Sequence, residues 1–151
     1  MKKDHLRLVT EADLPLLLQW RNHPSVQQFM YTTHEIQPEE HRRWFLNAAK
    51  NPLHHLFFYM QGEVPMGFVN LGPIKNGGIT DWGFYIAPGS PKGTGLALGV
   101  CALNHAFDEL LLHKVCGEAL GFNKISQKFH KRLGFSLEGE RKAQFFDGKN
   151  Y

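Results

Sequence analysis

Three runs of aromatic and β-branched residues lie close together in the middle of the chain and set the strongest limit on its fold. They cover residues 54–61, 64–71 and 79–86. The links between them carry turn formers, Gly62-Glu63 in the first and Asn76-Gly77-Gly78 in the second. Strands joined this tightly pair antiparallel, because a parallel pair needs a crossover of about a dozen residues or more. The sequence therefore predicts an antiparallel meander.

Two helices are expected before the meander. Thr10 followed by Asp13 is a rough capping box, and the helix that it opens should end at about Asn22. Pro38 with two acidic residues after it is typical of a first helical turn. Asn51-Pro52 should end that second helix.

Helix and strand signals alternate after the meander. A Gly/Pro/Lys loop over 89–95 leads into a helix whose apolar residues recur at three-to-four spacing over 96–110. A strand is expected over 114–120, followed by a short helix that Asn123 caps and Gly134 ends.

Two further signals follow this short helix. Phe135 should open another strand, and Asp147-Gly148 should form a hairpin turn. The expected order is then β-α-α-β-β-β-α-β-α-β, which predicts an α/β fold with a sheet of mixed direction. At 151 residues the chain is long enough for one domain core and too short for two, so a single domain is expected over 1–151.

The stretch most informative for function is Lys92-Gly93-Thr94-Gly95-Leu96-Ala97, between a strand and an amphipathic helix. The first turn of a helix has free N–H groups and the positive end of the helix dipole, so it can bind an anion. Glycines let the backbone approach phosphate oxygens closely. The stretch is neither the GxGxxG dinucleotide fingerprint nor a P-loop. A plain glycine turn before a helix is the alternative for so short a motif.

In this position the stretch is similar to the pyrophosphate loop, Gln/Arg-x-x-Gly-x-Gly/Ala, of the Gcn5-related N-acetyltransferases (GNAT family). The family's next marker, Asn-x-x-Ala/Ser…Tyr-x-x-x-Gly-Phe, resembles Asn123-Lys124-Ile125-Ser126 followed by His130-Lys131-Arg132-Leu133-Gly134-Phe135. The resemblance covers nearly the whole chain. It implies the GNAT acyltransferase fold, a mixed, mostly antiparallel (α+β) central sheet flanked by about four helices.

The resemblance also implies acetyl-CoA as the co-substrate, and no metal. Backbone N–H groups of the glycine loop would hold the CoA pyrophosphate, with a lysine where the family usually has Gln or Arg. The pantetheine arm would pair with the last strand of the meander, and the later motif would contact it from the other side. The residues expected to bind the cofactor are Tyr85, Ile86, Ala87, Lys92, Gly93, Thr94, Gly95, Leu96, Ala97, Asn123 and Ser126.

Within the family, Trp20-Arg21-Asn22-His23 and Phe29-Met30-Tyr31 resemble the branch of pseudaminic acid biosynthesis. That branch acetylates the 4-amino group of UDP-4-amino-4,6-dideoxy-N-acetyl-β-L-altrosamine, for flagellin glycosylation. Trp-Arg-Asn also occurs in ribosomal-protein N-terminal acetyltransferases, so a protein N-terminus or an aminoglycoside stays open as the acceptor. Such acceptors are cationic, whereas Arg21, Arg42 and Arg43 favour one that bears phosphate.

A UDP-aminosugar calls for flat or adaptable side chains around the uracil and the sugar, and for cations near the phosphates. A role in the core is the alternative for Met30 and for Trp44. The residues expected to bind this substrate are Arg21, Met30, Tyr31, His41, Trp44 and Trp82.

Acetyl transfer needs a neutral amine, a stabilised oxyanion and a proton for the leaving thiolate. His130 stands where many GNAT relatives place a Tyr acid, and an imidazole titrates near neutral pH. Asp81 is the candidate base. The alternative for His130 is a surface histidine on a helix, and the alternative for Asp81 is a contact with the substrate.

Charge and hydropathy limit the partners. The net charge of +3 is spread without a run of like charges, so we expect no nucleic-acid partner. No apolar run approaches the roughly 20 residues of a membrane span, and no secretory leader is recognisable, so we expect a cytoplasmic protein without membrane contact. A homodimer stays open, as does a non-catalytic acyl-CoA sensor. Residues with metal-ligand spacing are not found.

The end of the sequence carries one more expectation. GNAT proteins continue after the 147–148 turn with another strand, which inserts into the sheet beside 114–120. Without it, backbone groups inside a sheet would stay unpaired. We therefore expect that the domain lacks its final strand and that the native chain runs on, or that a partner strand takes its place.

Overall fold

A five-stranded sheet with the order β1-β2-β3-β4-β5 forms the centre of the structure, a computed structural model that describes residues 3–150. The pairs β1–β2, β2–β3 and β3–β4 are antiparallel, whereas β4 and β5 are parallel. The predicted meander and the mixed direction of the sheet are confirmed. The strands are β1 (Asp4–Leu8), β2 (His55–Gln61), β3 (Val64–Leu71), β4 (Ile79–Ile86) and β5 (Lys114–Cys116).

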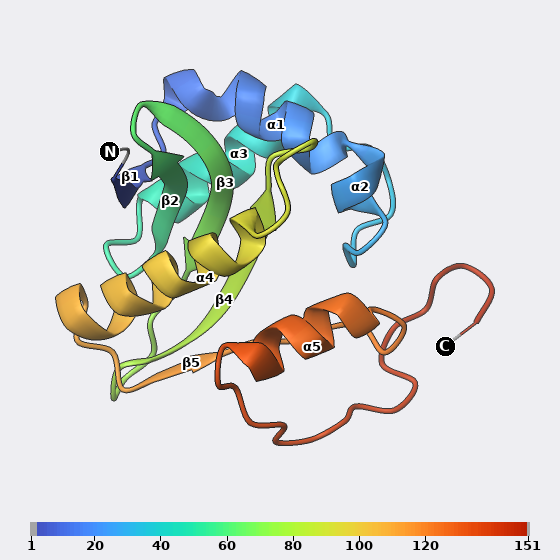
Figure 1. The fold of residues 1–151 in the computed structure, drawn as a ribbon. Coiled ribbons are helices and arrows are strands. Elements are labelled where there is room, and N and C mark those ends of the chain that lie inside the picture. Colours follow the sequence, from blue (N-terminus) through green and yellow to red (C-terminus); the bar gives the residue numbers. More distant parts are fainter. Residues whose placement is uncertain (1–2, 151) are drawn as a thin grey trace.

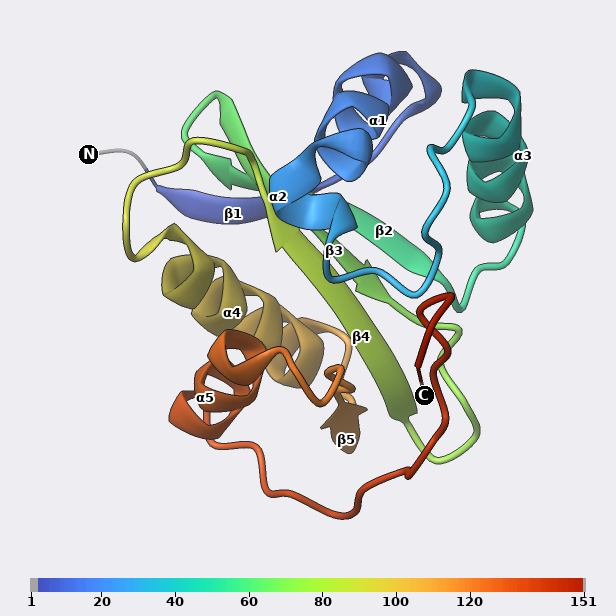
Figure 2. The same cartoon turned by 90° about the vertical axis from the view of Figure 1, so that its right-hand side faces the viewer.

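Helices cover both faces of this sheet (Figure 1). Figure 2 shows α1 and α3 on one side of the sheet and α4 and α5 on the other. These are the four helices that the sequence predicts, whereas the single turn α2 was not expected. Within the described residues, no helix is long and apolar enough to cross a membrane. The helices are α1 (Leu14–Asn22), α2 (Pro24–Gln27), α3 (Pro38–Ala49), α4 (Thr94–Asn104) and α5 (Lys124–Arg132).

The helix boundaries follow the capping signals in the sequence. The backbone N–H of Thr10 donates to Asp13 Oδ2 at 2.7 Å, which completes the predicted capping box. A short 3₁₀ turn begins there and leads directly into α1. Pro38 takes the first position of α3, and Gly134 has the left-handed φ of 96° that ends α5.

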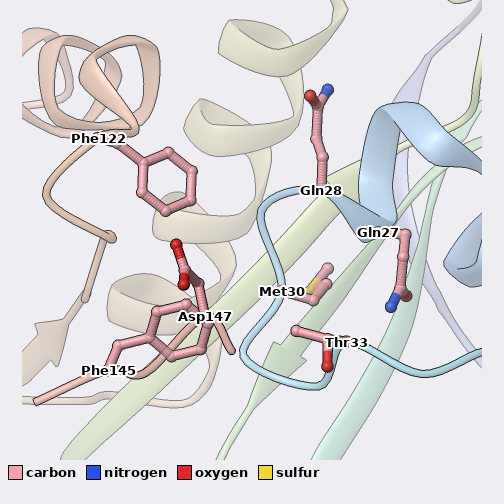
Figure 3. A pocket seen from close by; sticks show the side chains of 7 residues that line it. All are labelled: Gln27, Gln28, Met30, Thr33, Phe122, Phe145 and Asp147. Atoms are coloured by element: carbon pink, nitrogen blue, oxygen red, sulfur yellow. The ribbon is translucent and has the colours of Figure 1, made fainter. Parts of the chain in front are cut away.

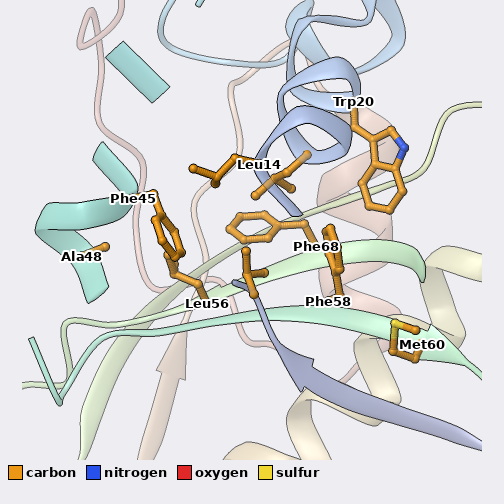
Figure 4. Close-up of a cluster of buried hydrophobic side chains, with 10 residues drawn as sticks. Leu14, Trp20, Phe45, Ala48, Leu56, Phe58, Met60 and Phe68 are labelled. Carbon is orange, nitrogen blue, oxygen red and sulfur yellow. The ribbon is translucent and has the colours of Figure 1, made fainter. Parts of the chain in front are cut away.

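One hydrophobic cluster fills the space between the sheet and α1 with α3 (Figure 4). Leu17 and Phe58 are fully buried in it, and the rings of Trp20 and Phe58 lie 5.2 Å apart. A buried large side chain contributes about 1.5–3 kcal/mol to folding. The cluster therefore fixes the helices that carry the expected acceptor residues. Its members are Val9, Leu14, Leu17, Trp20, Phe45, Ala48, Leu56, Phe58, Met60 and Phe68.

A second cluster lies on the opposite face, under α4. Leu98 and Ala102 of α4 are fully buried against the sheet, where Val69 and Leu71 are also fully buried. This packing holds the beginning of α4, and with it the glycine loop, next to the end of β4. A π-helical turn, His105–Glu109, continues α4 to the end of the predicted helix.

The C-terminal part differs from the expectation. β5 covers only 114–116, and the strand predicted from Phe135 is wrong, because 135–150 contain no strand. The ring of Phe135 stacks on Trp82 instead, with centroids 5.3 Å apart, and most of the residues after it are exposed. The chain turns at Asp147, where Oδ1 accepts from the N–H groups of two later residues, but the predicted hairpin is wrong because no strands of the described residues flank this turn. No strand of the described residues pairs with the outer edge of β5, and Tyr151 lies outside that range.

Gly72, directly after β3, allows a test of backbone geometry. Its φ is 132°, and an added Cβ would lie 2.6 Å from the carbonyl oxygen of Leu53. Gly72→Ala should lower the free energy of unfolding by at least about 1–3 kcal/mol, the cost of such a strained conformation. Chemical denaturation measures this. Gly121→Ala, where a Cβ meets nothing within 4 Å, is the control and should change stability by under about 0.5 kcal/mol. Equal stabilities of the two variants would contradict the account.

Candidate active site

The glycine loop forms the N-terminal end of α4. Gly93 adopts a left-handed φ of 96°, and Thr94 Oγ1 donates to the carbonyl of Pro91 at 2.7 Å. The N–H of Ala97 reaches the carbonyl of Gly93 at 3.1 Å. Among residues 3–150, no carbonyl accepts from the N–H groups of Gly95 or Leu96. These two donors, at the positive end of an 11-residue helix, can bind an anion.

Two glycines of α4 have different roles. A Cβ on Gly95 would be 3.8 Å from Phe129 and 4.0 Å from Ile86, which is ordinary contact, so the fold itself does not require a glycine there. A Cβ on Gly99 would be 2.7 Å from Leu133, so that glycine lets α5 pack against α4. The absence of a side chain at position 95 thus leaves room beside the free N–H groups.

Strand β4 changes neighbours along its length. Its residues 79–81 pair with β5, whereas 82–86 pair with β3 on the other edge. In the part of the chain that the structure describes, no strand lies on the β5 side of 82–86. This open edge begins where β4 and β5 separate and leads toward the beginning of α4. Tyr85 and Ile86 lie on it, as expected for a strand that takes up an extended ligand.

His130 lies at the point where β4 and β5 separate. Trp82 Nε1 donates to His130 Nε2 at 3.0 Å, and His130 Nδ1 is 2.7 Å from the carbonyl oxygen of Ser126. Gly117, directly after β5, gives this pair its room, since a Cβ there would be 2.5 Å from Nε2. Asn123 Oδ1 accepts from the N–H of Ser126 at 3.1 Å and caps α5. The later family motif thus positions His130.

Aromatic rings surround the imidazole of His130. Their centroids lie between 4.9 and 5.8 Å from it, and they come from Trp82, Phe84, Phe129 and Phe135. Trp82 itself is buried on the face of the sheet that α4 and α5 cover. The expectation that Trp82 binds the acceptor is therefore not supported by its position. Its indole N–H donates a hydrogen bond to His130 instead.

Three expected acceptor residues meet on the other face of the sheet, around Tyr85. His41 and Trp44 stack with centroids 5.2 Å apart, and the Tyr85 ring lies 5.0 Å from that of Phe68. Burial lowers the pKa of the Arg21 guanidinium, and the groups of Tyr85 and Glu40 act in the opposite direction. Arg21 Nη1 also donates to Gln27 Oε1. The guanidinium is therefore half-buried and held in one place.

The environment of His41 favours the neutral imidazole. Burial, and after it the positive charge of Arg21, lower the pKa of His41, and the residue is only 5 % exposed. A contact of His41 with phosphate stays a prediction. The imidazole supports Trp44 by stacking. Burial also raises the pKa of Tyr85, so its phenol keeps its proton.

Met30 lies apart from this group and lines a pocket of about 260 Å³ (Figure 3), and the ring of Tyr31 lies 5.5 Å from that of Phe145, another lining residue. Tyr31 Oη donates to Glu118 Oε2 at 3.3 Å, and Glu118 is paired with Arg141 at 2.9 Å. Gln27 links the two regions, because it accepts from Arg21 and lines the pocket. The pocket is lined by Gln27, Gln28, Met30, Thr33, Phe122, Phe145 and Asp147.

Asp81 and His130 do not come together. The Asp81 side chain is exposed on the face of β4 that carries Tyr85, and its carboxylate lies 3.6 Å from Lys75 Nζ. His130 contacts the neighbouring Trp82, and successive strand residues point to opposite faces. A role of Asp81 as base stays a prediction. In the described ranges, no group of three or more His, Cys, Asp or Glu side chains could hold a metal.

The relatives found by sequence comparison are named as acetyltransferases. Acetyltransferase PseH of Campylobacter jejuni is 28 % identical over 138 residues, covering 91 % of this chain and 86 % of the relative. PseH of a second strain is 27 % identical over 134 residues, covering 89 % and 83 %.

Solved structures share the fold. A spermidine N-acetyltransferase from Vibrio cholerae, in complex with CoA and spermine, superposes with a TM-score of 0.88 at 21 % identity, covering 98 % of this chain and 89 % of that one. Aminoglycoside acetyltransferase AAC(6')-Ib, in complex with coenzyme A, superposes with a TM-score of 0.78 at 18 % identity, covering 91 % and 86 %.

The family model described as "Acetyltransferase (GNAT) domain" matches residues 5–136, which include the glycine loop, the open edge of β4 and His130. The match spans most of the chain and agrees with the fold. The chain therefore belongs to the GNAT family of N-acetyltransferases.

Proposed function

We propose that this GNAT enzyme transfers the acetyl group of acetyl-CoA to the 4-amino group of a UDP-linked 4-amino-4,6-dideoxy sugar, UDP-4-amino-4,6-dideoxy-N-acetyl-β-L-altrosamine. Transfer is direct, in a ternary complex formed by a single domain. The observation that carries the proposal is the half-buried Arg21 beside Tyr85 and His41, on the face of the sheet opposite the glycine loop. The similarity to PseH of Campylobacter jejuni supports the pseudaminic acid pathway.

The cofactor would follow the free groups on the α4 side. The pyrophosphate takes the N–H groups of Gly95 and Leu96, and the exposed Lys92 adds a positive charge. The pantetheine arm extends from there along the open edge of β4, from Ile86 back to Trp82. Four residues of strand span about 13 Å at about 3.3 Å each. The thioester then lies where β4 and β5 separate, next to His130.

The acceptor would occupy the opposite side. Arg21 is the cation that meets the UDP phosphates, since a charge-assisted hydrogen bond is stronger than a neutral one. The pocket beside Met30 offers two aromatic walls, Phe122 and Phe145, for a planar base (Figure 3). The carboxylate of Glu118 is already paired with Arg141, so it offers less to a polyamine or an aminoglycoside.

An acceptor comparison tests the proposal. The enzyme is given acetyl-CoA with the UDP-aminosugar, the same sugar without UDP, spermidine, kanamycin or a peptide with a free N-terminus. CoA release is followed for each. We expect the highest kcat/KM for the UDP-linked sugar and a clear loss when UDP is removed. A preference for one of the cationic acceptors would refute the proposal.

Arg21→Ala tests the phosphate contact. The KM for the UDP-sugar should rise about 10–100-fold, because a hydrogen bond to a charged group is worth about 1.5–3 kcal/mol. The KM for acetyl-CoA should stay the same, since the cofactor lies on the other face. Lys50→Ala, which removes an exposed cation directly after α3, is the control and should resemble the wild type. Equal losses for both substrates in Arg21→Ala would point to a folding defect and not to a lost contact.

A further inference from the structure

The partners of His130 determine which of its nitrogens carries hydrogen. Nδ1 faces the carbonyl oxygen of Ser126 at 2.7 Å, and a carbonyl can only accept, so Nδ1 carries a hydrogen. Nε2 faces Trp82 Nε1 at 3.0 Å, and an indole N–H can only donate, so Nε2 carries a lone pair. The two contacts therefore select one tautomer of the imidazole, with hydrogen on Nδ1 and the lone pair on Nε2.

In this tautomer His130 cannot act as a general acid that is already protonated in the resting enzyme. Nε2 has no proton to give to a leaving thiolate. Adding one would turn two N–H groups toward each other, that of the imidazolium and that of Trp82. A side chain held in this way must receive a proton at Nε2 before it can deliver one.

We propose that His130 is a proton relay, which takes the proton of the acceptor amine and passes it to the sulfur of CoA, and that Trp82 is the positioning residue that sets this role. The proposal rests on the N-acetyl transfer described above, though not on the identity of the sugar. It makes a separate base unnecessary, which agrees with the exposed, ion-paired Asp81.

The steps balance without a further reactant. The amine nitrogen attacks the thioester carbon, so the N–C bond forms and the carbonyl electron pair moves to oxygen. The Trp82 N–H leaves Nε2, and the amine proton moves to the lone pair that is set free, which forms the imidazolium. The C–S bond then breaks as the oxyanion electron pair returns, and the thiolate takes the proton from Nε2. The products are the amide and CoA-SH, with His130 neutral again.

One imidazole can serve both atoms. The attacking nitrogen and the leaving sulfur are bonded to the same carbon in the tetrahedral intermediate, so they lie side by side. Gly117 packs closely against the His130–Trp82 pair, where even a Cβ would be 2.5 Å from Nε2, so the two reacting atoms must approach Nε2 from another side. Protonation of Nε2 breaks its hydrogen bond with Trp82. This loss disfavours the imidazolium, which therefore gives its proton to the thiolate quickly.

Other charged groups near His130 already have partners or point away. Asp81 on β4 is paired with Lys75, and Glu118 after Gly117 is paired with Arg141. Lys114 on β5 is paired with Glu138. The remaining titratable side chains on the elements packed around His130 are Tyr85 on β4, Cys116 on β5, Cys101 on α4, and Lys124, Lys128, Lys131 and Arg132 on α5.

The first experiment reads the tautomer in the whole protein, with ¹⁵N-labelled histidine and NMR. Near neutral pH, His130 should show a protonated Nδ1 and an unprotonated Nε2. In Trp82→Phe, which keeps an aromatic ring but removes the N–H donor together with part of the ring, the tautomers should mix. An Nε2–H tautomer or an imidazolium in the wild type at neutral pH would overturn the proposal, whatever amine the enzyme accepts.

The second experiment uses kcat on any amine that the enzyme acetylates. Because the neutral imidazole is the working form, kcat should not fall between about pH 7 and pH 9, whereas a standing acid would lose activity as it deprotonates. His130→Tyr, which offers a donor but no base at neutral pH, should lose about 10²–10⁴-fold in kcat. Nearly full activity of His130→Tyr would overturn the relay.

Trp82→Phe separates positioning from folding. Its kcat should fall about 10-fold, since misplacing a reacting group is costly, while both KM values stay close to the wild type. The melting temperature reports separately the cost of the smaller ring in the core. An unchanged kcat would remove Trp82 from the mechanism. If the enzyme acetylates another amine and not the UDP-sugar, the acceptor proposal fails. The kcat values of the variants on that other amine then test the relay.

Discussion

Gly95→Val should abolish the stabilisation of the protein by acetyl-CoA and leave the protein folded. At a ligand concentration 100 times its Kd, a ligand that binds only the folded state raises the free energy of unfolding by about 2.7 kcal/mol. The wild type should show this gain. The variant should not, because a branched side chain would fill the space beside the free N–H groups of Gly95 and Leu96.

The fold should tolerate this change. The nearest atom to a Cβ at position 95 is 3.8 Å away, so no clash with the protein is expected at that atom. Thermal melting with and without acetyl-CoA measures both quantities. Gly139→Val, where a Cβ meets nothing within 4 Å, is the control and should keep the full effect of the ligand. An acetyl-CoA shift that persists in Gly95→Val would show that this loop does not bind the pyrophosphate.

His130→Ala should lower kcat by about 10²–10⁴-fold at nearly constant KM for both substrates. This is the usual effect of removing a group that transfers a proton in the transition state, and such a group contributes little to ground-state binding. The loss thus differs in kind from that of Arg21→Ala, which should appear in the KM of the acceptor. Steady-state kinetics of the two variants, with each substrate varied in turn, makes the comparison.

Two outcomes would change this assignment. Turnover of His130→Ala at the wild-type rate would make His130 a structural residue of α5. A large rise in the KM for acetyl-CoA would instead mean that the aromatic surroundings of His130 collapse onto the cofactor site. The melting temperature of the variant, measured without ligand, reports such a collapse separately.

Local signals predicted the parts of the fold that depend on local chemistry. The capping box at Thr10, the cap at Asn123 and the left-handed Gly134 each act over a few residues, and each forms as expected. The strand at Phe135 failed because a strand also needs a neighbour. Sequence pattern alone could not tell that this ring would stack on Trp82.

The candidate site divides in the same way. The glycine loop was recognisable because its donors and its glycines lie within six consecutive residues. Gln27, Glu118 and Phe145 were missed, since their contacts join segments far apart in the chain, and no spacing rule reports them. Trp82 was assigned to the acceptor, but the alternation of side chains along β4 places it on the face that α4 and α5 cover, away from Arg21 and Trp44.

The two hydrophobic clusters on opposite faces of the sheet have a consequence for how such an enzyme changes over evolutionary time. Substitutions at sites more than about 7–10 Å apart, without shared partners, usually have additive effects on stability. In the proposed arrangement, new acceptors select changes in the layer of α1 and α3, whereas the layer of α4 and α5 keeps one cofactor. Each layer can accumulate substitutions without compensating changes in the other layer. A lineage can therefore change its amine acceptor while its acyl donor stays the same.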